Sequence, residues 1–208
     1  MTDRRHFVRD HTRLQRPPIV PELLLYLGDE LVPLWEATGR DEPPFWAFAW
    51  AGGQAVARYV LDHPGEVEGR TVLDLASGCG VGAIAAVRAG AVAVTAADVD
   101  PYARVAVELN ATANGVAVAG TYTDVLGEAP PAVDVLLVGD ACYERAMTVR
   151  VLAWLGTARE RGTRVLLGDP GRAYLPADGL TRLAEYDVPT TADLEGVTRR
   201  RTAVYSFG

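Results

Sequence analysis

Short hydrophobic runs alternate with amphipathic stretches through most of the chain. The short runs predict buried strands over residues 71–75, 92–97, 118–123, 133–138 and 163–167. The amphipathic stretches predict helices over residues 54–62, 81–89, 101–114 and 147–155. Strands and helices that alternate in this way form a mostly parallel sheet with helices on both faces. The pattern therefore predicts an α/β fold.

The end of the chain departs from this alternation. Residues 183–189 and 202–207 both have the composition of strands, and no clear crossover helix lies between them. Neighbouring strands that lack a crossover connection pair antiparallel. We therefore expect an antiparallel strand pair at the C-terminal edge of the sheet.

The first 44 residues are predicted to form a separate unit. Residues 1–16 carry five Arg and two Asp, which indicates a solvated arm outside the core. Five leucines at helical intervals predict a helix over residues 21–34: Leu23, Leu24, Leu27, Leu31 and Leu34. We divide the chain into an N-terminal arm and helix, residues 1–44, on or near the active site, and a main domain, residues 45–208.

Composition excludes several classes of protein. Hydrophobic residues make up 49% of the 208 residues, which is enough for a core without disulfides or metals. The net charge of −7 argues against nucleic-acid and anionic-membrane partners. Cys79 and Cys142 form no C-x-x-C pair, so no zinc site or disulfide is predicted. With no signal-peptide pattern and no dimer seam, we expect a cytoplasmic monomer without a metal.

A glycine-rich turn between a strand and a helix carries the strongest chemical signal. The segment reads V-L-D-L-A-S-G-C-G-V-G over residues 72–82. Strand ends of this kind bind nucleotide-like ligands. A loose dinucleotide fingerprint can be read from Gly78, Gly80 and Ala83, with Asp98 as the ribose-binding acid. Asp74 would repel a pyrophosphate but attract a cation, which favours S-adenosylmethionine.

The same segment resembles the first motif of class I S-adenosylmethionine-dependent methyltransferases, which have a Rossmann-like seven-stranded fold. A-D-V-D-P over residues 97–101 resembles their second motif, and residues 123–125 resemble the segment that meets adenine. The resemblance implies that Asp98 takes the ribose hydroxyls and that the loop glycines pack against the methionine part. The predicted cofactor-binding residues are Trp50, Gly53, Asp74, Ala76, Gly78, Gly80, Asp98, Val99, Asp124 and Asp140.

A second resemblance covers nearly the whole chain. Residues 43–55, the segment G-D-A-C-Y-E over residues 139–144 and residues 168–176 are similar to lysine methyltransferases that act on the β-subunit of electron transfer flavoprotein. The acid-x-x-aromatic motif of that group matches Asp140 and Tyr143, which the resemblance implies are catalytic. Ala51 departs from the Pro that many relatives carry. The resemblance implies the β-subunit as the protein substrate. The predicted substrate-binding residues are Trp46, Tyr143 and Arg172.

Each of these residues also has a plainer interpretation. Asp140 could simply cap the next helix, since Asp is a favoured N-cap residue, and Trp46 and Trp50 could belong to the core. Arg172 follows D-P-G and is most simply an exposed residue of a turn. If Asp140 does line the site, it attracts the charged amine, so its expected role is docking and orientation and not proton abstraction.

The function predicted from the sequence is protein lysine N-methylation, with S-adenosylmethionine converted to S-adenosylhomocysteine. Two alternatives stay open at this point. One is a small-molecule N-methyltransferase, acting for example on a nicotinamide-like ring nitrogen. The other is a protein that binds S-adenosylmethionine without turnover. The fold alone does not separate the three.

Overall fold

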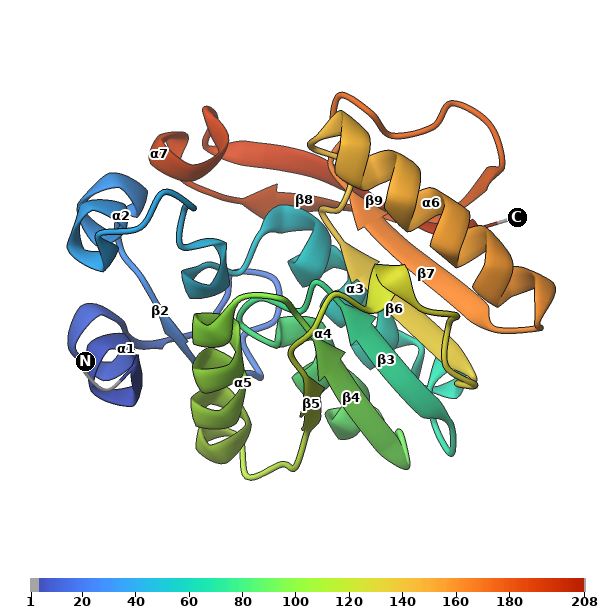
Figure 1. The fold of residues 1–208 in the computed structure, drawn as a ribbon, viewed down its shortest axis with the longest axis horizontal. Coiled ribbons are helices and arrows are strands. Elements are labelled where there is room, and N and C mark those ends of the chain that lie inside the picture. The colour runs from blue at the N-terminus through green and yellow to red at the C-terminus, as the bar shows by residue number, and fades with distance from the viewer. Residues whose placement is uncertain (1–3, 208) are drawn as a thin grey trace.

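The computed structural model describes residues 4–207 and is built on one seven-stranded sheet (Figure 1). The strand order is β5-β4-β3-β6-β7-β9-β8. Its strands are β3 (Thr71–Leu75), β4 (Ala93–Ala97), β5 (Ala119–Thr121), β6 (Val135–Gly139), β7 (Arg164–Asp169), β8 (Leu180–Pro189) and β9 (Arg199–Phe207). The strands from β5 to β7 pair in parallel, whereas β9 pairs antiparallel with both β7 and β8. The predicted fold, including the antiparallel C-terminal pair, is confirmed.

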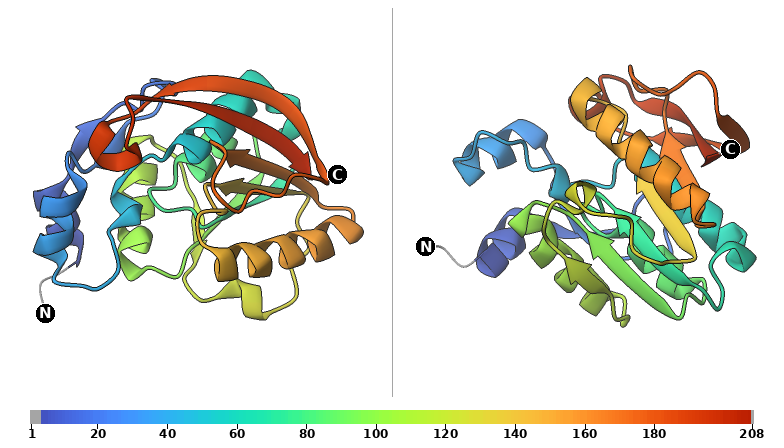
Figure 2. Two further views of the ribbon diagram at one scale, coloured as in Figure 1. Left: turned by 90° about the horizontal axis from the view of Figure 1, so that it is seen from above. Right: turned by 45° about the vertical axis from the view of Figure 1, so that its right-hand side comes forward.

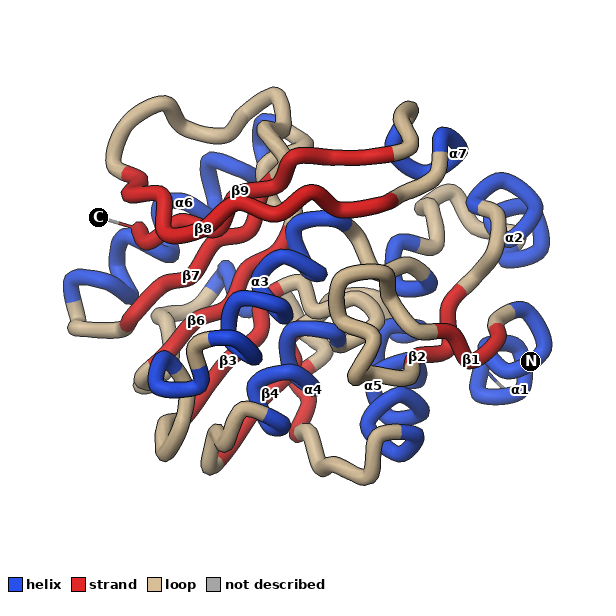
Figure 3. Tube along the Cα trace, turned by 180° about the vertical axis from the view of Figure 1, so that it is seen from behind, coloured by secondary structure: helices blue, strands red, loops and turns tan. Residues whose placement is uncertain are grey.

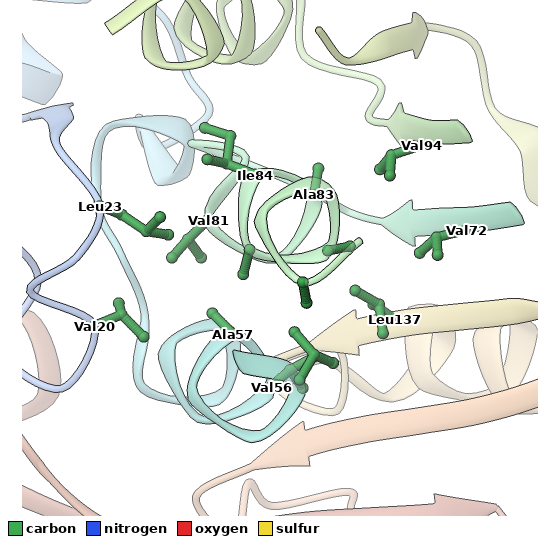
Figure 4. Packing of buried hydrophobic residues seen from close by; sticks show 14 of the residues in the cluster. Val20, Leu23, Val56, Ala57, Val72, Val81, Ala83, Ile84, Val94 and Leu137 are labelled. Atoms are coloured by element: carbon green, nitrogen blue, oxygen red, sulfur yellow. The ribbon is translucent and has the colours of Figure 1, made fainter. Parts of the chain in front are cut away.

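Helices cover both faces of this sheet. On one face α3 (Ala51–Asp62) and α4 (Val81–Arg88) pack against Val72 and Leu137 (Figures 3 and 4). On the other face α6 (Arg145–Glu160) packs against Leu73 and Leu136. These residues are adjacent in sequence to Val72 and Leu137, and adjacent side chains of a strand point to opposite faces of the sheet. No helix within residues 4–207 has the length and apolar character needed to span a membrane.

Helix α5 (Pro101–Ala113) begins where the sequence predicts, after β4. The Asp100 side chain accepts a hydrogen bond from the Tyr102 N–H at 2.8 Å, and Pro101 occupies the first helical position. Short helical turns complete the set: η1 (Phe45–Ala47), η2 (Pro64–Glu66), η3 (Val125–Gly127) and α7 (Ala192–Glu195), the last in the connection from β8 to β9.

The N-terminal arm is packed against the body, contrary to our expectation of a solvated arm. Helix α1 (Arg4–His11) lies beside α5 (Figure 2). It buries Phe7 and Val8 in a cluster that includes Leu109 of α5. Phe7 and Val8 give α1 an apolar face, which a count of charges over residues 1–16 does not reveal. Residues 1–3 of the predicted arm lie outside the described residues.

The predicted helix over residues 21–34 is wrong. Residues Leu25–Leu27 instead form strand β2, which pairs antiparallel with β1 (Arg13–Gln15). Up to residue 27 the buried leucines are Leu23, Leu25 and Leu27, an alternation with the period of a strand. Side chains of α5 hold this extended backbone: Asn110 accepts a hydrogen bond from the Tyr26 N–H at 2.6 Å. Helix α2 begins only afterwards and spans Leu31–Thr38.

The division of the chain at residue 44 stays a prediction. Residues before that point contribute to two hydrophobic clusters. Val20 and Leu23 pack with α3 and α4, whereas Phe7 and Leu34 pack with η1 and α5. The N-terminal segment thus shares its hydrophobic core with the rest of the chain.

Glycines allow the start of α3 to lie directly against the ends of two strands. A Cβ on Gly168 of β7 would lie 2.2 Å from the carbonyl oxygen of Gly52, and one on Gly52 would lie 2.3 Å from the carbonyl oxygen of Gly168. A Cβ on Gly139 of β6 would lie 2.6 Å from the backbone nitrogen of Gly53. Backbone faces backbone at all three points, so no side-chain movement could make room.

We therefore expect Gly168→Ala to lower the free energy of unfolding by about 1–3 kcal/mol, because the added methyl forces α3 away from the sheet. Urea unfolding measures this change. The matched control is Gly156→Ala on α6, where no atom lies within 4 Å of the added Cβ. That substitution should be neutral or stabilising, by up to about 1 kcal/mol, because it raises helix propensity. Equal stability of wild type and Gly168→Ala would contradict the packing described.

Candidate active site

A cavity of about 650 Å³ opens at the carboxyl ends of β3, β4 and β6. The segment Arg40–Trp50 forms one wall of it and the loops after the strands form the others. Of the residues predicted for the site, those that line this cavity are Trp46, Trp50, Ala76, Gly78, Asp98, Val99, Asp124, Asp140, Tyr143 and Arg172. Three other predicted residues, Gly53, Asp74 and Gly80, are not part of its lining.

The turn after β3 is shaped by backbone that most residues avoid. Ala76 has φ 54° and Gly78 has φ 51°, both in the left-handed region. The turn is tied to the next strand, because Gly78 N–H donates to Asp98 Oδ2 at 2.8 Å. Gly80, with φ 80°, then caps the start of α4. Its role in this structure is to form the turn, and Val107 lies 3.1 Å from where a Cβ would be.

Asp74 has a partner within the protein. Its Oδ2 accepts the Ala83 N–H of α4 at 2.8 Å, and its predicted attraction of the cationic end of a ligand stays a prediction. Burial raises the pKa of this carboxyl to about 7. In this structure Asp74 fastens the first turn of α4 to β3, because a buried carboxyl needs a donor and α4 presents one.

Asp98 is the carboxylate best placed for a ligand hydroxyl. It ends β4, lines the cavity and receives one backbone N–H on each oxygen: Gly78 on Oδ2, and Asp100 at 2.9 Å on Oδ1. Each carboxylate oxygen can accept more than one hydrogen bond, so Asp98 keeps acceptor capacity toward the cavity. Burial raises its pKa, an effect that the two N–H donors oppose.

Asp124 lies at the open edge of the cavity. It caps η3 by accepting the Leu126 N–H at 3.1 Å, and it pairs with Arg150 at 2.6 Å. Its hydrogen bond with Arg150 lowers its pKa, so Asp124 is ionised at neutral pH. Its predicted contact with an adenine ring stays a prediction.

Asp140, which directly follows β6, is held by hydrogen bonds on both carboxylate oxygens. Its Oδ2 accepts the Gly53 N–H at 3.1 Å, and its Oδ1 accepts two N–H groups of Arg172, from Nη2 at 2.6 Å and Nε at 3.1 Å. Its own backbone has φ 55°, a strained value for a residue other than glycine. Burial raises the pKa of Asp140 to about 6, against the lowering effect of Arg172. Gly53 thus contributes to the site through Asp140.

Arg172 is not the exposed turn residue that we expected. Its guanidinium binds Asp140 on one side and Glu195 of α7 on the other, at 2.8 Å from both Nη1 and Nη2. It also lies over the Trp50 ring, 5.9 Å from the centroid. Glu195 is buried and was missed by the sequence analysis. The only sequence signal for it was an acid within the turn of a predicted hairpin.

Aromatic rings form the mouth of the cavity. Phe45 lies edge-on to both Trp50 and Tyr143, with ring centroids 5.7 Å apart in each pair. Phe45 and Tyr143 are exposed, at 40% and 45%. Trp46 is buried and stacks on Tyr102, as its core interpretation expects, yet it also lines the cavity. Its indole N–H has no hydrogen-bond partner within residues 4–207, so a ligand acceptor could satisfy it.

The charge of the lining favours a cationic ligand over a phosphorylated one. Carboxylates of Asp98, Asp100, Asp124, Asp140 and Glu42 face or border the cavity. Its described lining contains two arginines, and both are paired: Arg172 with Asp140, and Arg40 with Asp100 at 2.9 Å. A pyrophosphate would meet net negative charge here, whereas a sulfonium or ammonium group would be attracted. The part of the chain that the structure describes contains no cluster of three or more metal-ligating side chains.

Two sets of sequence relatives match this chain. A family model described as ribosomal protein L11 methyltransferase (PrmA) matches residues 59–137. The electron transfer flavoprotein β-subunit lysine methyltransferase of Danio rerio is 36% identical over 215 residues, which cover 99% of this chain and 83% of that protein. The protein of the same name from Rattus norvegicus is 41% identical, over 91% of this chain and 78% of its own length.

Solved methyltransferase structures share the fold. The ribosomal protein L11 methylase of Lactobacillus delbrueckii has a TM-score of 0.54 at 19% identity and covers 76% of this chain and 80% of its own. The magnesium protoporphyrin IX methyltransferase of Synechocystis, solved with bound S-adenosylmethionine, has a TM-score of 0.53 at 18% identity and covers 74% of this chain and 79% of its own.

The buried Asp74 carboxyl predicts a pH dependence of stability. Its pKa is 3.8 in the unfolded chain and about 7 in the folded protein, so folding takes up a proton between these values. Its contribution to the free energy of unfolding therefore falls as the pH rises from 3.8 to about 7. Asp74→Asn removes this titration, and its amide oxygen can still accept the Ala83 N–H. Urea unfolding near both ends of that range should show a smaller loss of stability in the variant than in wild type.

Asp134→Asn is the matched control. Hydrogen bonds from Thr71 lower the pKa of Asp134, so this carboxylate stabilises the protein above its unfolded pKa and the stabilisation is lost as the pH falls. Because this titration lies at or below pH 3.8, Asp134→Asn should leave the fall of stability between pH 3.8 and about 7 nearly unchanged. An unchanged slope in Asp74→Asn would contradict the raised pKa.

Proposed function

Because the chain belongs to the family of electron transfer flavoprotein β-subunit lysine methyltransferases, we propose that it methylates lysine side chains of that β-subunit. The family is one of S-adenosylmethionine-dependent protein lysine N-methyltransferases, and this chain is such an enzyme. The proposed part is the identity of the substrate. The observation that carries it is the identity of 36% and 41% to methyltransferases named for that substrate, over 99% and 91% of this chain. The aromatic, carboxylate-lined cavity at the strand ends supports the binding of the cofactor.

The residues of the cavity fit S-adenosylmethionine. Asp98 has acceptor capacity left for ribose hydroxyls, and the turn at Ala76 and Gly78 leaves room beside it. Val99 and Asp124 lie on the side proposed for the adenine ring. The negative lining suits a ligand with a sulfonium and an ammonium and without phosphates. When bound, the cofactor supplies a methyl group on sulfur; the nitrogen lone pair forms the new N–C bond, and the electron pair of the broken C–S bond stays on sulfur.

The protein's part in this reaction is to position the amine and to favour its neutral form. A lysine with a pKa near 10.4 must lose its proton, which costs about 4–5 kcal/mol at pH 7. We assign Asp140 to positioning and not to proton abstraction: its oxygens accept three N–H groups, two from Arg172 and one from Gly53, which tie it to the walls of the cavity. Asp140 instead holds the walls of the cavity together. The proton is released to water at the open mouth.

The aromatic mouth would receive the lysine side chain. Phe45, Trp50 and Tyr143 present apolar surface for its methylenes and disfavour a charged head between them. Burial raises the pKa of Tyr143, so its hydroxyl stays protonated at neutral pH and can accept or donate a hydrogen bond at the amine. Holding the nitrogen in line with the methyl group supplies much of the rate.

The location, partners and oligomeric state of the protein are part of the same proposal. The net charge of −7 and the two free, buried cysteines support a cytoplasmic protein that acts without a nucleic-acid, membrane or metal partner. We propose a monomer, with the β-subunit as its macromolecular partner.

Transfer of a labelled methyl group tests the function directly. The protein is incubated with methyl-labelled S-adenosylmethionine and purified β-subunit, and then with a cell lysate. We expect label in the β-subunit band and, by peptide mass spectrometry, on lysine. The chain contains no lysine, so labelling of its own side chains cannot mimic this result. Asp98→Ala, which removes the proposed ribose acceptor, should abolish labelling at low cofactor concentration.

Other outcomes would replace the proposal. Label confined to the low-molecular-weight fraction of the lysate would make the protein a small-molecule N-methyltransferase. Cofactor binding by calorimetry without any transferred label would make it a binding protein without turnover. Label in a different protein band would keep lysine methylation and change the substrate.

A further inference from the structure

The motif acid Asp140 is part of a buried charge network that extends to the far hairpin. Arg172 joins Asp140, at the end of β6, to Glu195 in α7. The Nε of Arg200 in β9 lies 3.4 Å from Glu195 Oε2, which also accepts from Arg172. The side chains of Asp140, Arg172 and Glu195 are 11%, 18% and 1% exposed. Two carboxylates and two guanidiniums therefore share one enclosed region, and their formal charges cancel.

Burying these charged groups costs free energy, which their mutual pairing must offset. Removing charges from water is paid back only by good geometry, and a buried ion pair is often no more stable than an apolar replacement. Here the geometry is good. The Arg172 guanidinium donates one hydrogen bond to each carboxylate oxygen of Glu195 and two to Oδ1 of Asp140. The network also opens to the cavity, because both Asp140 and Arg172 line it.

An unpaired carboxylate at this place would oppose the reaction. A negative charge within about 4–6 Å of an amine raises the pKa of that amine by about 1–3 units, since it favours the ammonium form. Each unit lowers the fraction of neutral, nucleophilic lysine about tenfold at a fixed pH. The acid that positions the walls of the site would thus hold its substrate in the unreactive state.

We propose that Arg172 neutralises Asp140, so that a lysine entering the cavity meets no net negative charge from this wall and gives up its proton on binding. This inference rests on the proposed function and names Arg172 as an electrostatic positioning residue of the same site. Glu195 holds the guanidinium in place from behind.

The other groups around the network do not supply this charge. Asp169, at the end of β7, accepts the backbone N–H of Arg172 at 2.6 Å, and burial raises its pKa. Burial raises the pKa of the Cys142 thiol to about 12, so it is neutral. Trp50 of the α3 start offers a ring face, which favours the guanidinium but carries no charge. Within the described lining, Arg172 is the cation bonded to Asp140.

Proton release on binding tests the proposal without turnover. Calorimetry is run with protein saturated with S-adenosylhomocysteine in two buffers of different ionisation enthalpy, at about pH 9, well above the pKa of about 6 that Asp140 has beside Arg172, so that this carboxyl stays ionised when Arg172 is removed. The titrant is the purified β-subunit, and the reference is its Lys→Met variant at the lysine found by mass spectrometry. For wild type we expect a lysine-dependent release of protons, because the apolar mouth disfavours the ammonium and Arg172 neutralises Asp140. For Arg172→Met we expect release close to zero, because the uncompensated Asp140 retains the ammonium.

Three further variants separate charge from structure. Arg172→Lys keeps the positive charge and should restore most of the release. Arg172→Met combined with Glu195→Gln also removes the Glu195 charge, which would otherwise keep only Arg200 at 3.4 Å as its partner, and this double variant should still release no proton. Asp140→Asn combined with Arg172→Met removes the opposing charge and should recover release. Thermal unfolding and S-adenosylhomocysteine affinity report whether each variant is folded.

The pH dependence of kcat provides a second test of the proposal. In Arg172→Met the alkaline rise of kcat should move up by about one pH unit or more, so that activity lost at neutral pH returns at high pH. A purely structural role would lower kcat equally at every pH. Equal proton release by wild type and Arg172→Met, or no release by either, overturns the inference. Absence of methylation or of β-subunit binding in wild type would instead overturn the proposed function.

Discussion

The site depends on one close contact, the start of α3 against the ends of β6 and β7. At Gly52, Gly139 and Gly168 the backbones approach so closely that a single Cβ would overlap another backbone. This contact brings the Gly53 N–H to Asp140 and places Trp50 beside Arg172. The aromatic segment that precedes α3 is thereby fixed across the mouth of the cavity. The pair Gly52-Gly53 is thus required for the packing of α3 against the sheet, and this packing in turn forms the site.

The distribution of charge around the cavity follows from how its arginines are used. Arg40 is committed to Asp100 and Arg172 to Asp140 and Glu195, so neither is available to a phosphate. What remains is acceptor capacity on Asp98 and a negative rim, which suits a cationic nucleoside. The same pairing that excludes phosphates keeps Asp140 from holding a substrate ammonium. Cofactor choice and substrate activation therefore rest on the same buried pairs.

Local patterns predicted much of this structure, and long-range pairing was the part they missed. The strand–turn–helix segment at residues 71–88 and the capped start of α5 carry their signals in neighbouring residues, and both form as predicted. The leucines of residues 21–34 fit both the helical and the strand period, so the sequence pattern predicted a helix. The extended backbone is held by hydrogen bonds from distant residues, the side chains of Asn110 and Asn114. Arg172 and Glu195 are distant in sequence from Asp140, so no local pattern could show that they meet.

The central claim is that S-adenosylmethionine lies across the strand ends with its ribose on Asp98. A crystal structure with S-adenosylhomocysteine, at saturating concentration, tests it most directly. The account predicts both ribose hydroxyls within hydrogen-bond distance of the Asp98 carboxylate and the thioether sulfur on the side of Asp140 and Tyr143, with the Arg172 pair intact. A cavity without the nucleoside, or a ribose bound away from Asp98, would contradict it.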